Sequence, residues 1–156
     1  MHLPDHASTE RIGRGLAPVI EPGMRIYLKG ELGTGKTTLV RALLRALGVT
    51  GPVKSPSYAL VELYVVSSLH LYHFDFYRFR DPVEWRDTGF DEYFGGEGVC
   101  LVEWPERAAN QLPQPDVEIL LTHTGTGRNA QLTAHSKTGA KCLKSVSDLM
   151  ARESSS

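Results

Sequence analysis

Apolar side chains in the first third of the chain follow helical spacing, then strand spacing, then helical spacing again. From Ser8, a residue type that caps helices, apolar residues recur at helical intervals as far as Val19 or Ile20, and Pro18 and Pro22 help to end the helix. Residues 24–28 alternate in the manner of a short strand. Over 37–47 the apolar residues form one stripe of an amphipathic helix, and Gly48 follows as a left-handed cap. The pattern predicts a helix, a strand and a second helix.

Aromatic and β-branched residues, which favour strands, dominate the middle of the chain. Two such runs, 58–66 and 69–77, are separated by two serines and are predicted to form a hairpin. The polar, glycine-containing segment 82–98 predicts a short helix and a loop. Residues 99–102 are continuously apolar and end at Glu103, which is typical of a parallel strand buried on both faces. Two more strands and a final helix are expected over 117–121, 131–135 and 143–150.

This order of elements predicts an α/β fold with a central, mostly parallel sheet, an antiparallel hairpin extension and flanking helices. A chain of 156 residues fits one domain, which we expect to span 1–152 with a frayed tail over 153–156. With 41% apolar residues and a net charge of -1, an intrinsically disordered chain is excluded. The balance of 17 basic and 18 acidic residues also argues against a basic face that binds nucleic acid directly.

The two cysteines and the N-terminus bear on the compartment. Cys100 lies in an apolar run and Cys142 near the C-terminus, a pattern that indicates reduced thiols rather than a disulfide framework. The first residues lack the basic start and apolar core of a signal peptide, and no stretch is long and apolar enough to span a membrane. We therefore expect a cytoplasmic protein with no membrane partner.

A phosphate-binding loop is the strongest chemical signal in the sequence. Residues 30–37 read GELGTGKT, which fits the motif G-x-x-x-x-G-K-[ST] and lies between the predicted strand and helix. Its glycines allow consecutive N–H groups to point at a phosphate, and the helix N-terminus adds partial positive charge. Lys36 is expected to reach the β- and γ-phosphates, Thr37 to bind Mg²⁺, and Thr38 to contact the α-phosphate. The loop positions expected to bind nucleotide also include Gly33, Thr34 and Gly35.

Acidic residues at strand ends could complete this site. Glu103, at the end of the buried run, is the type of residue that holds the metal beside a phosphate-binding loop. Strand periodicity places His73, Asp75 and Tyr77 on one face, where Asp75 could orient water or a metal-bound water with His73 as its hydrogen-bond partner. For His73 and Tyr77 alone, a polar face in solvent that supports the sheet is the favoured interpretation.

Two further features remain open from the residues alone. Ser55 and Ser57 lie on a proline-stiffened loop that is equally compatible with a surface loop and with a segment that senses the γ-phosphate. Trp104 directly follows Glu103, and a tryptophan is most often a packing residue.

Four motifs in order resemble one family, TsaE (also called YjeE), the small P-loop ATPases of bacterial tRNA threonylcarbamoyladenosine synthesis. The resemblance runs from about Ser8 to Arg128. Residues 30–39 are similar to the family's G-[DE]-L-G-[AT]-G-K-T-T-L, and 55–58 to its S-P-T-[FY], with serine at 57 in place of the usual threonine. Residues 73–78 are similar to H-x-D-x-Y-R, and 102–105 to [IV]-E-W-[PS]. The fold implied is that of a P-loop NTPase.

The resemblance implies ATP hydrolysis with Mg²⁺ and two protein partners, TsaB and TsaD. Together with threonylcarbamoyl-AMP made by TsaC, they modify the adenosine beside the anticodon of tRNAs that read codons beginning with A, so that this chain serves tRNA indirectly. It further implies that Thr37 and Glu103 hold Mg²⁺. Lys36, Asp75, Glu103 and Trp104 would be needed for activity, and Ser8 or Thr9 together with Arg128 would lie near the nucleotide base.

Two other functions remain as alternatives. A small-molecule kinase would need an acceptor pocket and usually an arginine-bearing lid, but the segment 79–98 is short and offers Arg80 and Arg86. A nucleotide-dependent interaction module would bind ATP or ADP without turnover. The sequence leaves open which carboxylate activates water, what hydrolysis drives, and the oligomeric state.

Overall fold

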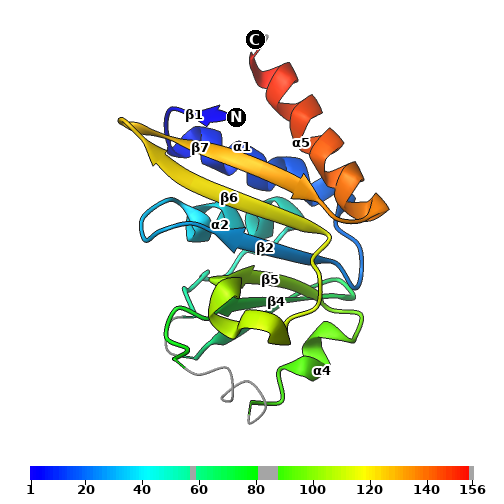
Figure 1. Ribbon diagram of the computed structural model, residues 1–156. Helices are drawn as coiled ribbons and strands as arrows, with labels where there is room; N and C mark the ends of the chain where they lie inside the picture. The colour runs from blue at the N-terminus through cyan, green and yellow to red at the C-terminus, as the bar shows by residue number, and fades with distance from the viewer. Residues whose placement is uncertain (57–58, 81–87, 155–156) are drawn as a thin grey trace.

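A mixed sheet with helices on both faces forms the centre of the protein, as the computed structural model shows for residues 1–56, 59–80 and 88–154 (Figure 1). The described residues form seven strands in the order β1-β7-β6-β2-β5-β4-β3. The central strands β6, β2, β5 and β4 are parallel, whereas β7 and β3 are antiparallel to their inner neighbours. The strands are β1 (His2–Leu3), β2 (Arg25–Lys29), β3 (Val61–Val66), β4 (Leu69–Asp75), β5 (Val99–Glu103), β6 (Val117–Thr124) and β7 (Gly127–Ala134). This confirms the predicted mostly parallel sheet with an antiparallel hairpin at its edge.

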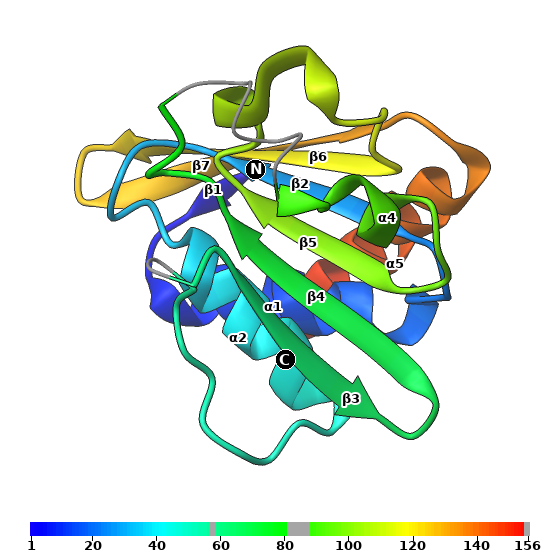
Figure 2. The same ribbon diagram turned by 90° about the horizontal axis from the view of Figure 1, so that it is seen from below.

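The helices divide between the two faces of this sheet. Figure 2 shows α1, α2 and α5 together on one face, with α4 and the short 3-10 helix η2 on the other. Their bounds, with the short η1 that extends α1, are α1 (His6–Leu16), η1 (Ala17–Val19), α2 (Lys36–Leu47), α4 (Asp91–Phe94), η2 (Pro105–Gln111) and α5 (Lys137–Ser154). No helix among the described residues is long and apolar enough to cross a membrane.

Each face of the sheet carries its own hydrophobic cluster. The face under α1, α2 and α5 packs aliphatic side chains such as Ile12, Leu43 and Leu101, whereas the opposite face packs aromatic rings including Phe74 and Phe94. All five residues of β5 are buried because helices cover both of its faces, which explains its unbroken apolar run. Burial also raises the pKa of the Cys100 thiol to about 12 and that of Cys142 to about 11, so both are packing residues.

Three local differences from the sequence predictions have clear physical reasons. Helix α1 is capped by Asp5 rather than Ser8, because the Asp5 carboxylate accepts from both the backbone N–H of Ser8 (2.9 Å) and its hydroxyl (2.8 Å). Strands β6 and β7 are longer than predicted because they pair as one hairpin around Gly125. Helix α5 begins earlier and continues past the predicted boundary at 152, where Glu153 pairs with Arg11 and Arg14.

The parallel strands bring their carboxyl ends to one edge of the sheet. Leu28 on β2 and Asp75 on β4 are both in register with Glu103 on β5. The chain leaves β2 at Lys29 and enters α2 at Lys36, so the connecting loop lies above the same edge. Sites in parallel α/β sheets form at such edges, and the predicted site residues meet here.

Candidate nucleotide-binding site

The loop between β2 and α2 has the backbone shape that phosphate binding requires. Gly30, Gly33 and Gly35 have φ angles of 145°, 78° and 103°, all in the region that residues with a side chain rarely adopt. Gly35 is also the N-cap of α2, so the N-terminus of this helix, with its free backbone N–H groups, lies at the end of the loop. A Cβ atom at Gly35 would overlap the guanidinium group of Arg128, which lies directly against the loop. The loop therefore needs glycine both for its turn and for this close approach.

Lys36 is buried under the loop and held by it. Its Nζ donates to the carbonyl oxygens of Gly30 and Glu31, the latter at 3.1 Å, and only 5% of the residue is exposed. Burial lowers the pKa of Lys36, while the carboxylates of Glu103, Glu106 and Asp75 oppose that change. Three carboxylates nearby favour the charged ammonium, which is the form that binds phosphate oxygens.

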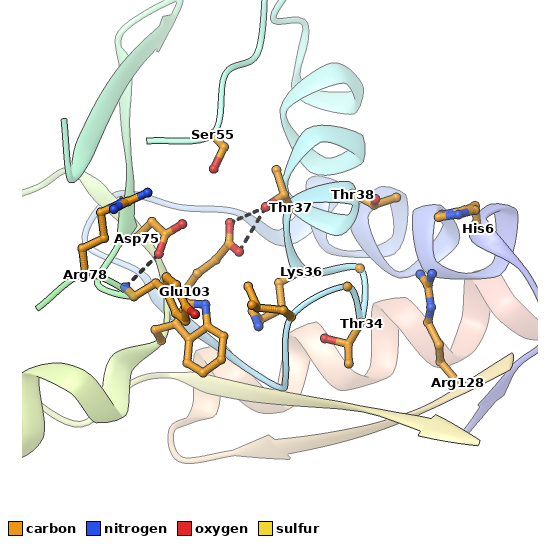
Figure 3. Close-up of a pocket in the computed structure, with 15 residues that line it drawn as sticks. His6, Thr34, Lys36, Thr37, Thr38, Ser55, Asp75, Arg78, Glu103 and Arg128 are labelled. Atoms are coloured by element: carbon orange, nitrogen blue, oxygen red, sulfur yellow. Dashed lines mark hydrogen bonds between the residues drawn. The ribbon is translucent and has the colours of Figure 1, made fainter. Parts of the chain in front are cut away.

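Thr37, Glu103 and His73 form a hydrogen-bonded chain beside the loop. The Thr37 hydroxyl lies 3.1 Å from Oε1 and 2.9 Å from Oε2 of Glu103 (Figure 3). On the other side, His73 Nε2 lies 2.7 Å from Glu103 Oε2, and His73 is fully buried. The expected partnership of His73 with Asp75 is therefore wrong, as is the expectation that His73 faces solvent. Its side of β4 packs toward α1 and α2, and the neighbouring strand β5 supplies the acceptor.

Asp75 occupies the end of β4 next to Glu103. Its Oδ1 accepts from the backbone N–H of Tyr77 at 2.9 Å, and only 7% of the residue is exposed. Burial raises the pKa of Asp75, and the nearby Glu103 carboxylate raises it further, against the opposing effects of the Tyr77 N–H, His73 and Lys36. A carboxylate with a raised pKa is a stronger base, which suits it to orient or deprotonate water.

Trp104 lines the cavity next to Lys36. Its φ of 58° is left-handed. The centroid of its ring lies 4.0 Å from Lys36 Nζ and 5.0 Å from the centroid of the Tyr77 ring. The guanidinium of Arg107 lies 5.6 Å from the same tryptophan ring. Trp104 thus lines the cavity and also packs against the aromatic cluster, and its residue type alone does not indicate the first of these roles.

These side chains surround a cavity of about 420 Å³. Figure 3 shows His6 and Arg128 at one end and Asp75 and Arg78 at the other, with Lys36 and Thr37 between them. The cavity is lined by His6, Leu32, Gly33, Thr34, Gly35, Lys36, Thr37, Thr38, Ser55, Asp75, Tyr77, Arg78, Glu103, Trp104 and Arg128. Most predicted nucleotide-binding and catalytic residues are therefore brought together in one place.

Not every predicted residue lines the cavity. Thr9 is fully buried behind it, where its hydroxyl accepts from Arg128 at 3.4 Å, so it contacts the wall rather than the space. Thr34 lines the cavity, but its hydroxyl donates to the Glu31 carbonyl within the loop. Ser55 lines the cavity, whereas Ser57 and Arg86 lie outside the described residues.

Besides Ser55, whose role the sequence leaves open, four residues of the wall were not among the predicted site residues: His6, Leu32, Tyr77 and Arg78. Leu32 lies inside the predicted phosphate-binding loop, and Tyr77 was expected to support the sheet in solvent. Arg78 belongs to the segment 73–78 that carries a motif, and this was the available signal. His6 is the first residue of α1, and its place in the wall depends on how that helix packs against α2, which sequence spacing does not reveal.

Comparison with known proteins connects this site to a family. The family model of the threonylcarbamoyl adenosine biosynthesis protein TsaE matches residues 3–131. The tRNA threonylcarbamoyladenosine biosynthesis protein TsaE of Haemophilus influenzae is 37% identical over 152 residues, covering 94% of this chain and 96% of the relative. The Bacillus subtilis protein of the same name is 42% identical over 117 residues, covering 75% and 73%. The crystal structure of Bacillus subtilis YdiB is similar with a TM-score of 0.77 and 33% identity, over 92% of this chain and 90% of YdiB. Matching motifs, fold and relatives together establish that this chain belongs to the TsaE family.

Proposed function

We propose that this protein binds ATP with Mg²⁺ in the cavity, hydrolyses ATP, and thereby serves threonylcarbamoylation of the adenosine beside the anticodon in tRNAs that read codons beginning with A. Its relatives carry the name tRNA threonylcarbamoyladenosine biosynthesis protein TsaE, and the family model spans most of the chain. The observation that carries the nucleotide part is the contact of the Thr37 hydroxyl with both oxygens of Glu103 beside the glycine loop.

The donor set at this contact fits Mg²⁺. Hydroxyl and carboxylate oxygens are ligands that this cation prefers, and it usually keeps several waters and binds through one or two protein groups plus substrate phosphates. Among the described residues, no group of three or more His, Cys, Asp or Glu side chains is placed to hold a metal by itself. Thr37 and Glu103 would therefore hold the metal together with the nucleotide. When bound, Mg²⁺ neutralises charge on the β- and γ-phosphates.

The chain's own residues supply the remaining steps. Lys36 exchanges the carbonyl oxygens of Gly30 and Glu31 for phosphate oxygens and stabilises the charge that develops during transfer. Both oxygens of Glu103 already accept from Thr37, and one also pairs with His73, which suits a fixed ligand rather than a mobile base. Asp75, whose pKa is raised by burial, is the better group to orient and deprotonate the attacking water.

We further propose that the protein acts in the cytoplasm with TsaB and TsaD and reaches tRNA through them. The chain carries 17 basic and 18 acidic residues, so it does not have the excess positive charge of proteins that bind nucleic acid on their own. Hydrolysis in a partner-dependent machine is expected to be weak for the isolated chain, because the transition state is stabilised fully only in the assembled complex.

Phosphate release from ATP by the purified protein, measured alone and with TsaB and TsaD, tests this proposal. We expect release to rise when both partners are present, and tRNA modification to require the wild-type chain in a mixture that also holds TsaC. Thr37→Val, which keeps the shape but removes the hydroxyl, should abolish both signals. Thr138→Val on α5, which removes an exposed hydroxyl bonded to Glu21, is the matched control.

Two outcomes would replace the proposal with one of its alternatives. Phosphorylation of a small metabolite, with turnover unaffected by the partners, would identify a kinase. ATP binding without turnover, combined with intact tRNA modification, would identify a nucleotide-dependent interaction module.

A further inference from the structure

His73 is a buried polar residue whose position the proposed roles do not yet explain. It lies on β4 in register with Leu101 of β5 and Glu62 of β3, and it is fully buried. Its Nδ1 has no hydrogen-bond partner among the residues that the structure describes. Burying an imidazole with one unpaired nitrogen costs free energy that an aliphatic side chain would not cost. Packing alone therefore does not account for a histidine here.

The contact with Glu103 does account for it. A carboxylate only accepts hydrogen bonds, so the 2.7 Å contact requires a proton on His73 Nε2. Nε2 is therefore the nitrogen that donates, and Nδ1 is the nitrogen without a partner among the described residues. This ring donates to Oε2 of Glu103, the same carboxylate that accepts from Thr37.

Two donors from two different elements thus fix one carboxylate. Thr37 comes from the first turn of α2, and His73 comes from β4, while Glu103 ends β5 between them. We propose that His73 is a positioning residue that locks the Glu103 carboxylate in the orientation that Thr37 and Mg²⁺ require. This inference rests on the proposed function for the task of Glu103, but not for the hydrogen bond itself. Partners that orient metal ligands in this way often matter nearly as much as the ligands.

A matched pair of amide variants separates positioning from packing. In His73→Gln the side-chain amide nitrogen stands near the place of Nε2 and can still donate to Glu103. In His73→Asn the amide is one carbon shorter, stands near the level of Nδ1, and cannot reach the carboxylate. Phe74→Leu, in the aromatic cluster on the opposite face of the same strand, is a control that lowers stability without touching Glu103.

The measurement is ADP binding with and without Mg²⁺, followed by phosphate release with TsaB and TsaD. We expect His73→Asn to raise the Mg²⁺ concentration needed for tight binding about 10- to 100-fold and to lower kcat, with ADP affinity in EDTA unchanged. His73→Gln should restore most of both, and Phe74→Leu should lower Tm only. Equal losses in His73→Asn and His73→Gln, an unchanged Mg²⁺ requirement in His73→Asn, or an equal loss of affinity in EDTA would overturn the inference.

Nitrogen NMR of the imidazole distinguishes this inference from the proposed function. A wild-type protein that shows no Mg²⁺-dependent nucleotide binding would refute the function. The ¹⁵N signals would still report whether His73 carries its proton on Nε2 and whether Glu103→Ala changes them, as we expect. A His73 ring that carries its proton on Nδ1, or ¹⁵N signals that do not change in Glu103→Ala, would refute the positioning role.

Discussion

The ammonium group of Lys36 lies 4.0 Å from the centroid of the Trp104 ring. The two residues come from different elements, since Lys36 begins α2 and Trp104 follows β5 in a left-handed conformation with a φ of 58°. The backbone N–H of Trp104 donates to the Leu28 carbonyl at 3.3 Å, which ties this turn to the strand that leads into the loop. A cation over an aromatic face is stabilised electrostatically, so the ring keeps the ammonium group in the cavity.

Lys36→Ala should lower ATP and ADP affinity about 10- to 100-fold, because a hydrogen bond to a charged group contributes about 1.5–3 kcal/mol. Isothermal titration calorimetry would measure the affinities, and circular dichroism would check the fold. Lys29→Ala is the matched control, since Lys29 ends β2, the strand before the loop, but pairs with Glu118 outside the cavity. Equal affinities for the wild type and Lys36→Ala would remove Lys36 from the binding site.

Asp75→Asn should lower turnover while raising stability at neutral pH. Burial raises the pKa of Asp75, so the native state holds this proton more tightly than the unfolded chain does. The stability that protonated Asp75 contributes to the native state is therefore present below the ordinary pKa of 3.8 and is lost as the pH rises through the raised native pKa. Asparagine cannot ionise and avoids this loss, so the variant should gain more in Tm at pH 7 than at pH 3.

Thermal unfolding at both pH values, with nucleotide binding and phosphate release at pH 7, checks this prediction. Nucleotide binding should suffer less than turnover, because Asp75 is assigned to water rather than to phosphate. Asp148→Asn provides the exposed control, since this carboxylate pairs only loosely with Lys144 at 3.8 Å. A loss of binding in Asp75→Asn as severe as in Lys36→Ala would contradict the assigned role.

The meeting of Thr37 and Glu103 could be predicted from sequence because it depends on few facts. A glycine-rich loop precedes one helix, a buried parallel strand ends in an acid, and parallel strands align their carboxyl ends. The partner of His73 could not be predicted, because a period of two gives the face of a residue but not which neighbouring strand supplies its acceptor. Asp5 was missed as the cap of α1 because Ser8 has equal capping chemistry, and only the start of the helix decides between them.

Gly13→Ala should destabilise the fold by about 1–3 kcal/mol, because it over-packs the contact between α1 and α2. A Cβ at this position would lie 2.6 Å from the Leu39 carbonyl oxygen, 2.8 Å from the Leu43 nitrogen and 2.9 Å from the Ala42 Cβ. Two of these are backbone atoms of a helix and cannot move aside. Urea unfolding would measure the change in free energy.

Gly51→Ala is the matched control for this contact. Among the described residues, no heavy atom lies within 4 Å of a Cβ built there, apart from the glycine's own chain neighbours. The substitution should be neutral or stabilise by up to about 1 kcal/mol, since alanine restricts the unfolded chain. Similar losses in the two variants would show that α1 and α2 pack less closely than described.

Asp5→Ala should lower Tm at pH 7 more than Ser8→Ala does, because Asp5 accepts both hydrogen bonds at the start of α1 and Ser8 donates them. Ser8→Ala removes the hydroxyl but keeps the backbone N–H contact.

The two hydrogen bonds from Ser8 lower the pKa of Asp5 below 3.8, chiefly through the Ser8 hydroxyl and then its N–H. A lowered native pKa means that the stabilisation is complete above 3.8 and is lost as the pH falls through the native value. The difference in Tm between the wild type and Asp5→Ala should therefore be constant from pH 7 to 5 and shrink on further acidification. A difference that stays constant down to pH 2, or a larger loss in Ser8→Ala at pH 7, would return the capping role to Ser8.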